Sequence, residues 1–254
     1  MSLGSGSKGN ATLVESANAC LLVDCGFSVA ELTLRMAREG RHPDQLSAIL
    51  VTHEHADHIR GALPLARRYS LPIYLTAGTL SEIHSGNTRG LSNVKFECID
   101  THQEFKIEDI AVSPIAVPHD AREPVQFVFR CQGRSLGVLT DLGSVTSHVI
   151  DSYRYCDGLL LEANHDSGML ASGPYPYPLK QRVGGDWGHL NNHQAAALIS
   201  SIGTEHLQGI VIGHMSEQNN CLEKVKQEIG PLLADVPEVQ YASQAKGGNW
   251  LVVD

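Results

Sequence analysis

Apolar residues along the chain fall into short runs that are separated by polar, often glycine-containing turns. In the first part of the chain, alternating or compact apolar runs predict strands, and apolar residues three and four apart predict helices. The predicted strands are residues 12–15, 19–24, 46–52, 73–75 and 94–99. The predicted helices are residues 28–39, which Gly40 ends, and 61–69.

The remainder of the chain is richer in predicted strands. These are residues 105–107, 111–117, 125–131, 134–140, 159–162, 207–212, 239–242 and 250–253. Helices are predicted at residues 192–201, with Asn192 as the N-cap, and at 222–229. Residues 166–188 contain prolines at 174, 176 and 178 and are predicted to form a loop. Because no repeat, charge block or linker interrupts the pattern, we expect one domain spanning residues 1–254.

The composition is ordinary for a soluble globular protein, with 42% hydrophobic and 19% charged residues. The net charge of −9 argues against a generally basic nucleic-acid-binding surface, so an anionic substrate would have to be attracted by a local field. The six cysteines form no C-x-x-C pair, which favours free thiols over disulfides. With a polar N-terminus and no apolar run of about 18 residues, we expect a cytoplasmic protein without a membrane segment.

Three histidines and an aspartate are crowded into the segment that follows the predicted strand 46–52. They form the pattern H-x-H-x-D-H at His53, His55, Asp57 and His58. Residues that leave the end of a strand can converge on one point, and imidazole with carboxylate suits Zn, Mn or Fe. The helical zinc motif H-E-x-x-H is excluded because position 57 is Asp. A solvated histidine-rich loop is the alternative, but four potential ligands at this spacing favour a metal site.

Further donors are expected at other strand ends, because four ligands so close in sequence do not complete two metal shells. His119, Asp141 and His214 each follow a predicted strand. Taken singly, each is an ordinary loop residue. The repeated arrangement of an apolar run followed by one donor indicates that the three belong to the same site.

The order H-x-H-x-D-H, His, Asp, His at strand ends resembles the metallo-β-lactamase superfamily. The resemblance implies an α/β fold, the four-layer αββα sandwich, in which two mixed sheets are flanked by helices. It also implies seven ligands for two divalent ions, which would be Zn, Mn or Fe. One ion would be held by His53, His55 and His119, the other by Asp57, His58 and His214, with Asp141 bridging. Asp24 would support the ligand loop from behind, although it also fits a plain turn.

Motifs spread over nearly the whole chain resemble, more closely, the YycJ/WalJ family. They are residues 3–10, 22–26, 118–120, 140–143, 161–166, 188–192 and 214–220. This resemblance implies a nuclease that degrades DNA in the 5′→3′ direction. The interval between Asp141 and His214 is too short for the domain-sized insertion of the β-CASP nucleases, and Asn191 stands where Ser is expected.

A two-metal centre suits phosphodiester cleavage. We expect a metal-bound hydroxide to attack phosphorus, with Asp57 orienting it and accepting its proton. His165 or His189 would donate a proton to the leaving oxygen, although both also fit ordinary surface or helix-cap histidines. The ions carry four positive charges, of which Asp57 and Asp141 neutralise two, so the site would attract a phosphate despite the acidic protein.

Small polar residues flank the expected centre and are candidates for substrate contacts. Ser5, Ser7 and Asn10 lie in a Gly/Ser segment that either cradles a phosphate or forms a flexible terminal turn. Ser216 and Asn219 follow His214, so they lie on the pocket rim unless they cap the next helix.

Other readings remain consistent with the same residues. An ester or thioester hydrolase, like glyoxalase II or a lactonase, would use the same ions to polarise a carbonyl. A non-catalytic metal-binding regulatory module is disfavoured because the ligand set is complete. Tyr175 and Tyr177, among prolines, either stack on bases or simply pack.

Overall fold

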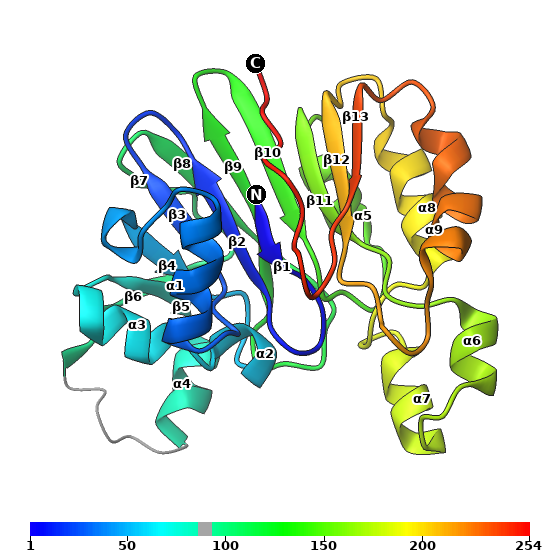
Figure 1. Ribbon diagram of the computed structural model, residues 1–254, viewed down its shortest axis with the longest axis horizontal. Coiled ribbons are helices and arrows are strands. Elements are labelled where there is room, and N and C mark those ends of the chain that lie inside the picture. The colour runs from blue at the N-terminus through cyan, green and yellow to red at the C-terminus, as the bar shows by residue number, and fades with distance from the viewer. Residues whose placement is uncertain (86–92) are drawn as a thin grey trace.

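The computed structural model describes residues 1–85 and 93–254, and its centre is a pair of β-sheets packed face to face (Figure 1). The first sheet contains, in spatial order, β1 (Ser2–Gly4), β2 (Ala11–Glu15), β3 (Cys20–Val23), β4 (Ala48–Leu50), β5 (Ile73–Thr76) and β6 (Phe96–Ile99). Its strands are antiparallel from β1 to β3 and parallel from β3 to β6.

The second sheet is also mixed. It contains β7 (Phe105–Ile107), β8 (Ile110–Ala116), β9 (Val125–Cys131), β10 (Arg134–Leu139), β11 (Gly158–Glu162), β12 (Gly209–Gly213) and β13 (Glu238–Tyr241). The strands are antiparallel from β7 to β10 and parallel from β10 to β13.

Helices cover the outer face of each sheet (Figure 1). α1 (Val29–Arg38), α3 (Ala62–Tyr69) and α4 (Ala77–Ser85) lie on the first sheet, and α5 (Ser147–Tyr153), α8 (Asn192–Ile202) and α9 (Leu222–Ile229) lie on the second. Short 3₁₀ helices occupy Pro43–Gln45 and Gly230–Leu233. The expected α/β fold with two mixed sheets flanked by helices is therefore confirmed.

Strand periodicity explains how both faces of each sheet become buried. In β3, Leu21 faces the other sheet, whereas Leu22 packs under the helices of the first sheet. In β12, Val211 faces the first sheet, whereas Ile210 and Ile212 pack against α8 and α9. Since successive side chains point to opposite faces, a strand between two apolar layers must be apolar throughout. The continuous apolar runs in the sequence reflect this arrangement.

Several local predictions were incomplete or wrong. Residues 250–253 do not form a strand, and α8 is capped by Asn191 rather than Asn192, because the Asn191 side chain accepts from the Gln194 N–H. The predicted loop 166–188 contains α6 (Ser167–Ser172) and α7 (Tyr177–Val183), and Pro176 and Pro178 lie at the start of α7, where proline is tolerated. The helices α2 (Ala56–Ile59), α4 and α5 and the strand β1 were not predicted.

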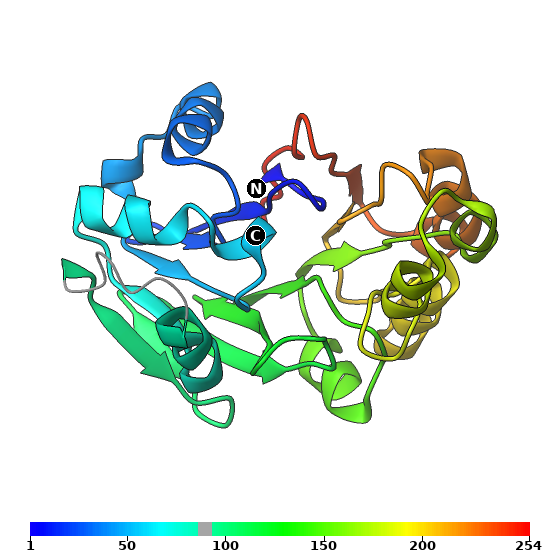
Figure 2. The ribbon, with the colours of Figure 1, turned by 90° about the horizontal axis from the view of Figure 1, so that it is seen from below.

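The loops that leave the carboxyl ends of β3, β4, β8, β10, β11 and β12 meet at one edge of the sandwich, beside α2 and α7. Figure 2 views the molecule from this side. All six cysteines are free thiols. Within the described residues, every helix is too short or too polar to cross a lipid bilayer.

Candidate metal centre

The seven residues predicted to bind metal converge at this edge. Ligand atoms that lie within 4.8 Å of one another group as His53–His55–His119, His53–His58–Asp141, Asp57–His58–His214 and Asp141–His189–His214. Each predicted ligand belongs to at least one of these groups. The last group also includes His189, which the sequence had assigned to proton transfer.

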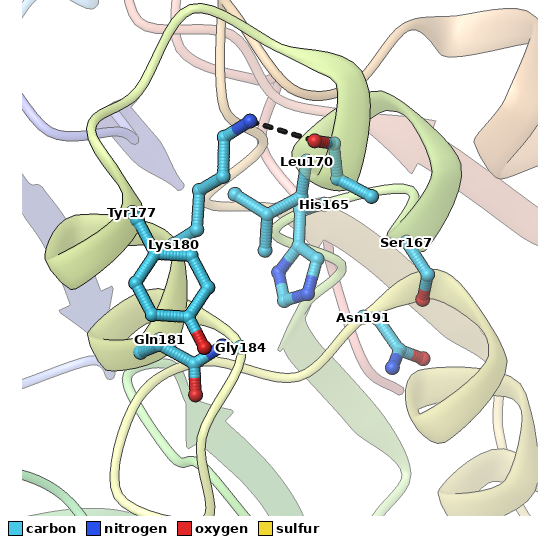
Figure 3. Close-up of a pocket in the computed structure, with 9 residues that line it drawn as sticks. His165, Ser167, Leu170, Tyr177, Lys180, Gln181, Gly184 and Asn191 are labelled. Carbon is cyan, nitrogen blue, oxygen red and sulfur yellow. Dashed lines mark hydrogen bonds between the residues drawn. The ribbon is translucent and has the colours of Figure 1, made fainter.

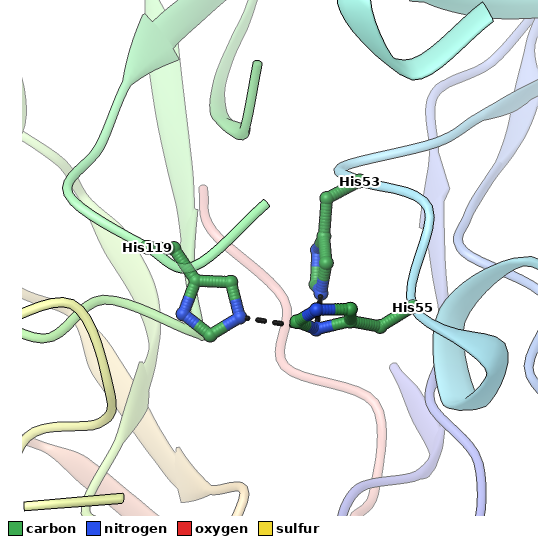
Figure 4. Close-up of side chains that lie close together, drawn as sticks. All are labelled: His53, His55 and His119. Carbon is green, nitrogen blue, oxygen red and sulfur yellow. Dashed lines mark hydrogen bonds between the residues drawn. The ribbon is translucent and has the colours of Figure 1, made fainter. Parts of the chain in front are cut away.

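His53, His55 and His119 approach one another from two loops (Figure 4). His53 Nε2 lies 3.0 Å from His55 Nδ1, and His119 Nε2 lies 3.3 Å from the same atom. His53 and His119 are buried, and His55 is partly exposed. One nitrogen of each ring therefore points at the same small volume. For His53 and His119, the hydrogen bond made by the other ring nitrogen decides which nitrogen carries the proton.

Neighbours in the first sheet orient His53 and His58. Asp24 Oδ2 accepts from His58 Nδ1 at 2.8 Å and from Thr52 Oγ1 at 2.8 Å. Because the Thr52 hydroxyl gives its only proton to Asp24, it accepts from His53 Nδ1, which is 2.9 Å away. In the neutral forms of His53 and His58, the lone pair therefore lies on Nε2.

The second sheet orients His119 and His214 in the same way. The Gly188 carbonyl can only accept, so His119 Nδ1 donates to it at 3.0 Å. His214 Nδ1 donates to Glu162 Oε2 at 3.3 Å, and its Nε2 is buried without a hydrogen bond to any described residue. The inner nitrogens of all these histidines are thus available as ligands, as is usual for metal-binding imidazoles held by outer hydrogen bonds.

Asp141 lies between the two sets of histidines. Its Oδ2 is 3.4 Å from His58 Nε2, and its Oδ1 is 3.4 Å from His214 Nδ1. Asp141 Oδ2 is buried and makes no hydrogen bond within the described parts of the chain. Asp24, Asp141 and His214 have φ values of 60°, 57° and 51°, a left-handed conformation that costs about 1–3 kcal/mol in a non-glycine residue. These unpaired acceptors and strained positions fit divalent cations such as Zn, Mn or Fe.

The electrostatics of the site favour a carboxylate surrounded by positive charge. Burial opposes a charge on Asp141, but His214 and His58 hold the pKa of its carboxyl well below the usual value. Burial also opposes a charge on His58, but Asp141 and Asp24 raise the pKa of His58 well above its usual value. Burial, reinforced by His58, holds the pKa of His53 well below its usual value, so His53 is neutral, the form that binds metal.

Glu162 is a residue of the site that the sequence analysis did not single out. It is fully buried at the end of β11. Its Oε1 accepts from the N–H groups of Leu142 at 2.9 Å and Leu190 at 3.1 Å. Its Oε2 lies 3.2 Å from His189 Nδ1 and 3.3 Å from His214 Nδ1. One carboxylate therefore orients two imidazoles of the centre.

The contacts of Glu162 also change the local charge. Burial opposes its ionisation, but the hydrogen bonds from His189 and His214 lower the pKa of Glu162 to about 2. Burial likewise opposes a charge on His189, but the hydrogen bond to Glu162 raises the pKa of His189. The sequence offered a signal for Glu162, because it is a carboxylate at the end of an otherwise apolar predicted strand. Charged residues are rarely buried unless they are paired, so a carboxylate in this position indicates a buried partner. The ionised Glu162 adds a negative charge that the sequence-based count omitted.

The small polar residues of the N-terminal segment have different surroundings. Ser7 is exposed and lines a cleft of about 340 Å³ over the centre. Ser5 is buried, and its Oγ accepts from the His214 backbone N–H at 2.7 Å. Asn10 is also buried, and its backbone N–H donates to the carbonyl of Asp57 at 2.8 Å. Ser5 and Asn10 therefore support the ligands, whereas Ser7 can reach a substrate.

The remaining candidates are more scattered. Ser216 Oγ accepts from the Asn219 N–H at 3.1 Å, Asn219 is fully buried, and neither lines the cleft. His165 is buried and lines a separate pocket beside α6 and α7. Arg182, which the sequence did not reveal because it falls in a predicted loop, lines the cleft, and its guanidinium pairs with Asp120.

Comparison with known proteins finds relatives that span most of the chain. Residues 20–212 match a family described as a beta-lactamase superfamily domain. The chain is 37% identical to exodeoxyribonuclease WalJ of Streptococcus pneumoniae, over 87% of this chain and 82% of the relative. It is 33% identical to exodeoxyribonuclease YycJ of Bacillus anthracis, over 92% and 88%. The solved structure of Zn²⁺-bound PqqB from Methylobacterium extorquens shares the fold, with a TM-score of 0.75, 18% identity and 99% of each chain covered.

Proposed function

The chain belongs to the β-lactamase superfamily and, within it, to the YycJ/WalJ family, and from this premise we propose that this metal-dependent hydrolase is a two-metal phosphodiesterase that degrades DNA from the 5′ end. The observation that carries the proposal is the convergence of histidine nitrogens around the buried carboxylate of Asp141. The choice of DNA is supported by relatives named as exodeoxyribonucleases.

The ligands divide between two ions as the superfamily pattern implies. One ion would be held by His53, His55 and His119 and the other by Asp57, His58 and His214, with Asp141 shared. When bound, two such ions supply a water of lowered pKa and neutralise charge on the phosphate oxygens. Asp57 lines the cleft and is only partly buried, so its carboxylate can orient the attacking water and take up its proton.

His189 is the proton donor to the leaving oxygen in this proposal. It lines the cleft, and its Nδ1 is held by Glu162 Oε2, which leaves Nε2 for a contact with the substrate. His165 has no such position, because it lines a different pocket. Ser7 and Arg182 lie at the cleft and are suited to contact phosphate oxygens on either side of the cleaved bond.

The proposal is tested with protein that is stripped of metal by chelation and reloaded with Mn²⁺ or Zn²⁺. The substrates are bis(p-nitrophenyl) phosphate, end-labelled DNA, RNA and a thioester. We expect metal-dependent hydrolysis of the small diester and of DNA. A 5′ label should be released as a mononucleotide at once, whereas a 3′ label should remain on progressively shorter strands.

Two outcomes would overturn the proposal. Turnover of the thioester alone would mean that the centre polarises a carbonyl rather than attacking a phosphate. Full metal occupancy without activity on any substrate would indicate a regulatory metal-binding module. Early release of the 3′ label would contradict only the direction of degradation.

A further inference from the structure

A second pocket, of about 410 Å³, lies between α6, α7 and the start of α8 (Figure 3). It is separate from the cleft over the metal centre, and the two have no lining residue in common. Pockets of this size accommodate small organic groups. No part of the proposed hydrolytic mechanism uses it.

The helix α7 separates the pocket from the cleft. Tyr177 and Lys180 on this helix, with Gly184 just after it, line the pocket, whereas Leu179 and Arg182 line the cleft. Residues three or four apart share one face of a helix, so these sets occupy two different faces. Because an α-helix with its side chains is about 10 Å wide, a short stretch of extended nucleic-acid strand can reach both sites.

A buried imidazole without a partner points into the pocket. His165 is 2% exposed, and its Nδ1 makes no hydrogen bond with the described residues. Figure 3 shows its ring among Leu170, Gly184 and Asn191, which line the same pocket. Burial lowers the pKa of His165 to about 4, so the ring is neutral near pH 7 and offers one donor and one acceptor. Because Nδ1 is itself closed off from solvent, a ligand in the pocket would reach the other ring nitrogen, Nε2, which lies 3.9 Å from the position of a Cβ at Gly184.

The walls of the pocket combine apolar surface with uncharged polar edges. Leu170 lies on one side, and Gln181 and Asn191 contribute amides. Tyr177, at the mouth of the pocket, is 73% exposed, so most of its side chain is accessible to a ligand. The only ammonium in the lining, that of Lys180, donates to the Ala171 carbonyl at 2.6 Å (Figure 3). This chemistry suits a flat heteroaromatic group with polar edges better than an anion.

We propose that this pocket binds an unstacked nucleobase of the strand whose phosphodiester lies at the metal centre, an inference that rests on the proposed function. Tyr177 provides a stacking surface, and His165 and Gln181 bond the edge of the base. Stacking on an aromatic ring tolerates every base, so the pocket would hold the strand without reading its sequence. The base would fix the position of the neighbouring phosphate over the ions.

The test is a scan of single abasic (tetrahydrofuran) residues along the terminal nucleotides of a DNA substrate. For the wild-type holoenzyme, one position should lower kcat/KM by about 5- to 150-fold, the equivalent of about 1–3 kcal/mol for one stacked base. Tyr177→Ala should lower kcat/KM on intact DNA by a similar factor and lose its sensitivity to that position. Tyr155→Ala is the matched control, because Tyr155 is 68% exposed and lies just before β11, at the end of the strands opposite the metal centre.

A second variant fills the pocket instead of removing its wall. Gly184 has a φ of −90°, and a Cβ there would lie 3.2 Å from Leu170 Cδ2 and 3.9 Å from His165 Nε2. Gly184→Val should therefore obstruct the pocket and reproduce the loss on DNA. Because a Cβ there also lies 3.3 Å from the Lys180 carbonyl oxygen, the melting temperature of this variant is measured alongside, so that a folding defect is distinguished from a filled pocket.

Binding of a phosphorothioate-linked oligonucleotide, which resists cleavage, gives a readout that is independent of turnover. Tyr177→Ala and Gly184→Val should bind it more weakly by fluorescence anisotropy, and Tyr155→Ala should not. Equal abasic sensitivity and equal binding in the wild type and Tyr177→Ala would overturn the pocket proposal. Failure of the wild type to hydrolyse bis(p-nitrophenyl) phosphate or DNA contradicts the proposed function instead, and the anisotropy still decides the pocket.

Discussion

The two sheets contribute to the metal centre in different ways. On the side of the first sheet, one short segment after β4, residues 53–58, which runs from a loop into α2, supplies three histidines and an aspartate. The second sheet supplies one group from each of several strand ends, namely His119 after β8, Asp141 after β10, Glu162 at the end of β11 and His214 after β12. The first contribution is local in sequence, and the second is assembled from distant segments.

Strand register creates the second contribution. Leu139 of β10 lies beside Leu161 of β11, which lies beside Ile212 of β12. Asp141 and His214 each follow this row by two positions, and Glu162 follows it by one. Because a slip of one residue turns a strand's side chains to the opposite face, the register of the parallel strands determines whether these groups meet. Ligands from one short segment stay close together when the register of the strands changes. Ligands at the ends of separate strands move apart.

The largest expected effect comes from Asp141→Asn, because Asp141 contacts histidines of both contributions. In the proposed two-ion site Asp141 is the shared anionic ligand, whose loss costs several kcal/mol of stabilisation, so kcat/KM on bis(p-nitrophenyl) phosphate should fall about a thousandfold. Mass spectrometry of bound metal should show a parallel loss. Asp151→Asn, an exposed aspartate on α5, should retain both properties. Full metal content in Asp141→Asn would contradict the shared ligand.

His55→Ala and His119→Ala test whether the local and distributed contributions meet at one ion. The two rings approach to 3.3 Å, although they come from different sheets. Each variant should lose about one ion and roughly a hundredfold in activity, and the double variant should lose little more, since residues that act on one ion are not additive. Measured kinetics and metal content would contradict this arrangement if the two losses simply multiplied.

Glu162→Gln and Asp24→Asn compare the supports behind the two contributions. Glu162 holds His214, and Asp24 holds His58. Replacing a carboxylate that orients a metal-binding histidine typically lowers metal affinity by about 10- to 100-fold, so we expect similar losses from both variants. Titration with a competing Zn²⁺ chelator measures this. A lower melting temperature with unchanged metal affinity would instead show a purely structural role.

The smallest effect concerns a surface ion pair between the segment that follows β1 in the first sheet and the loop that follows β12 in the second. Lys8 Nζ lies 2.6 Å from Glu217 Oε2, with 71% and 52% of the side chains exposed. Exposed pairs contribute less than about 1 kcal/mol, so Lys8→Gln should change the free energy of unfolding in urea by about 0.5 kcal/mol or less. The difference should disappear near 1 M salt, where the screening length is about 3 Å. A larger or salt-independent change would mean that the pair has a structural role.

Much of the fold was predictable because its strands are apolar on both faces. The runs around β3, β4, β11 and β12 were recognised for this reason. The N-terminal strand β1 was missed because Leu3 is flanked by glycine and serine, and its strand conformation depends on pairing with β2. α6 and α7 were missed because prolines and glycines surround them, although proline suits the first turn of a helix.

The sequence by itself indicated a cluster of candidate metal ligands, because the H-x-H-x-D-H pattern lies within six consecutive residues and needs no distant partner. It also indicated His119, Asp141 and His214, since each follows an apolar strand. Only the tertiary structure showed that Glu162 contacts both His189 and His214. It also showed that Ser5 and Asn10 hydrogen-bond the backbone of predicted metal ligands and that His165 lines a separate pocket. These roles depend on which strand ends and helices become neighbours, and that is decided by sheet pairing and packing rather than by spacing along the chain.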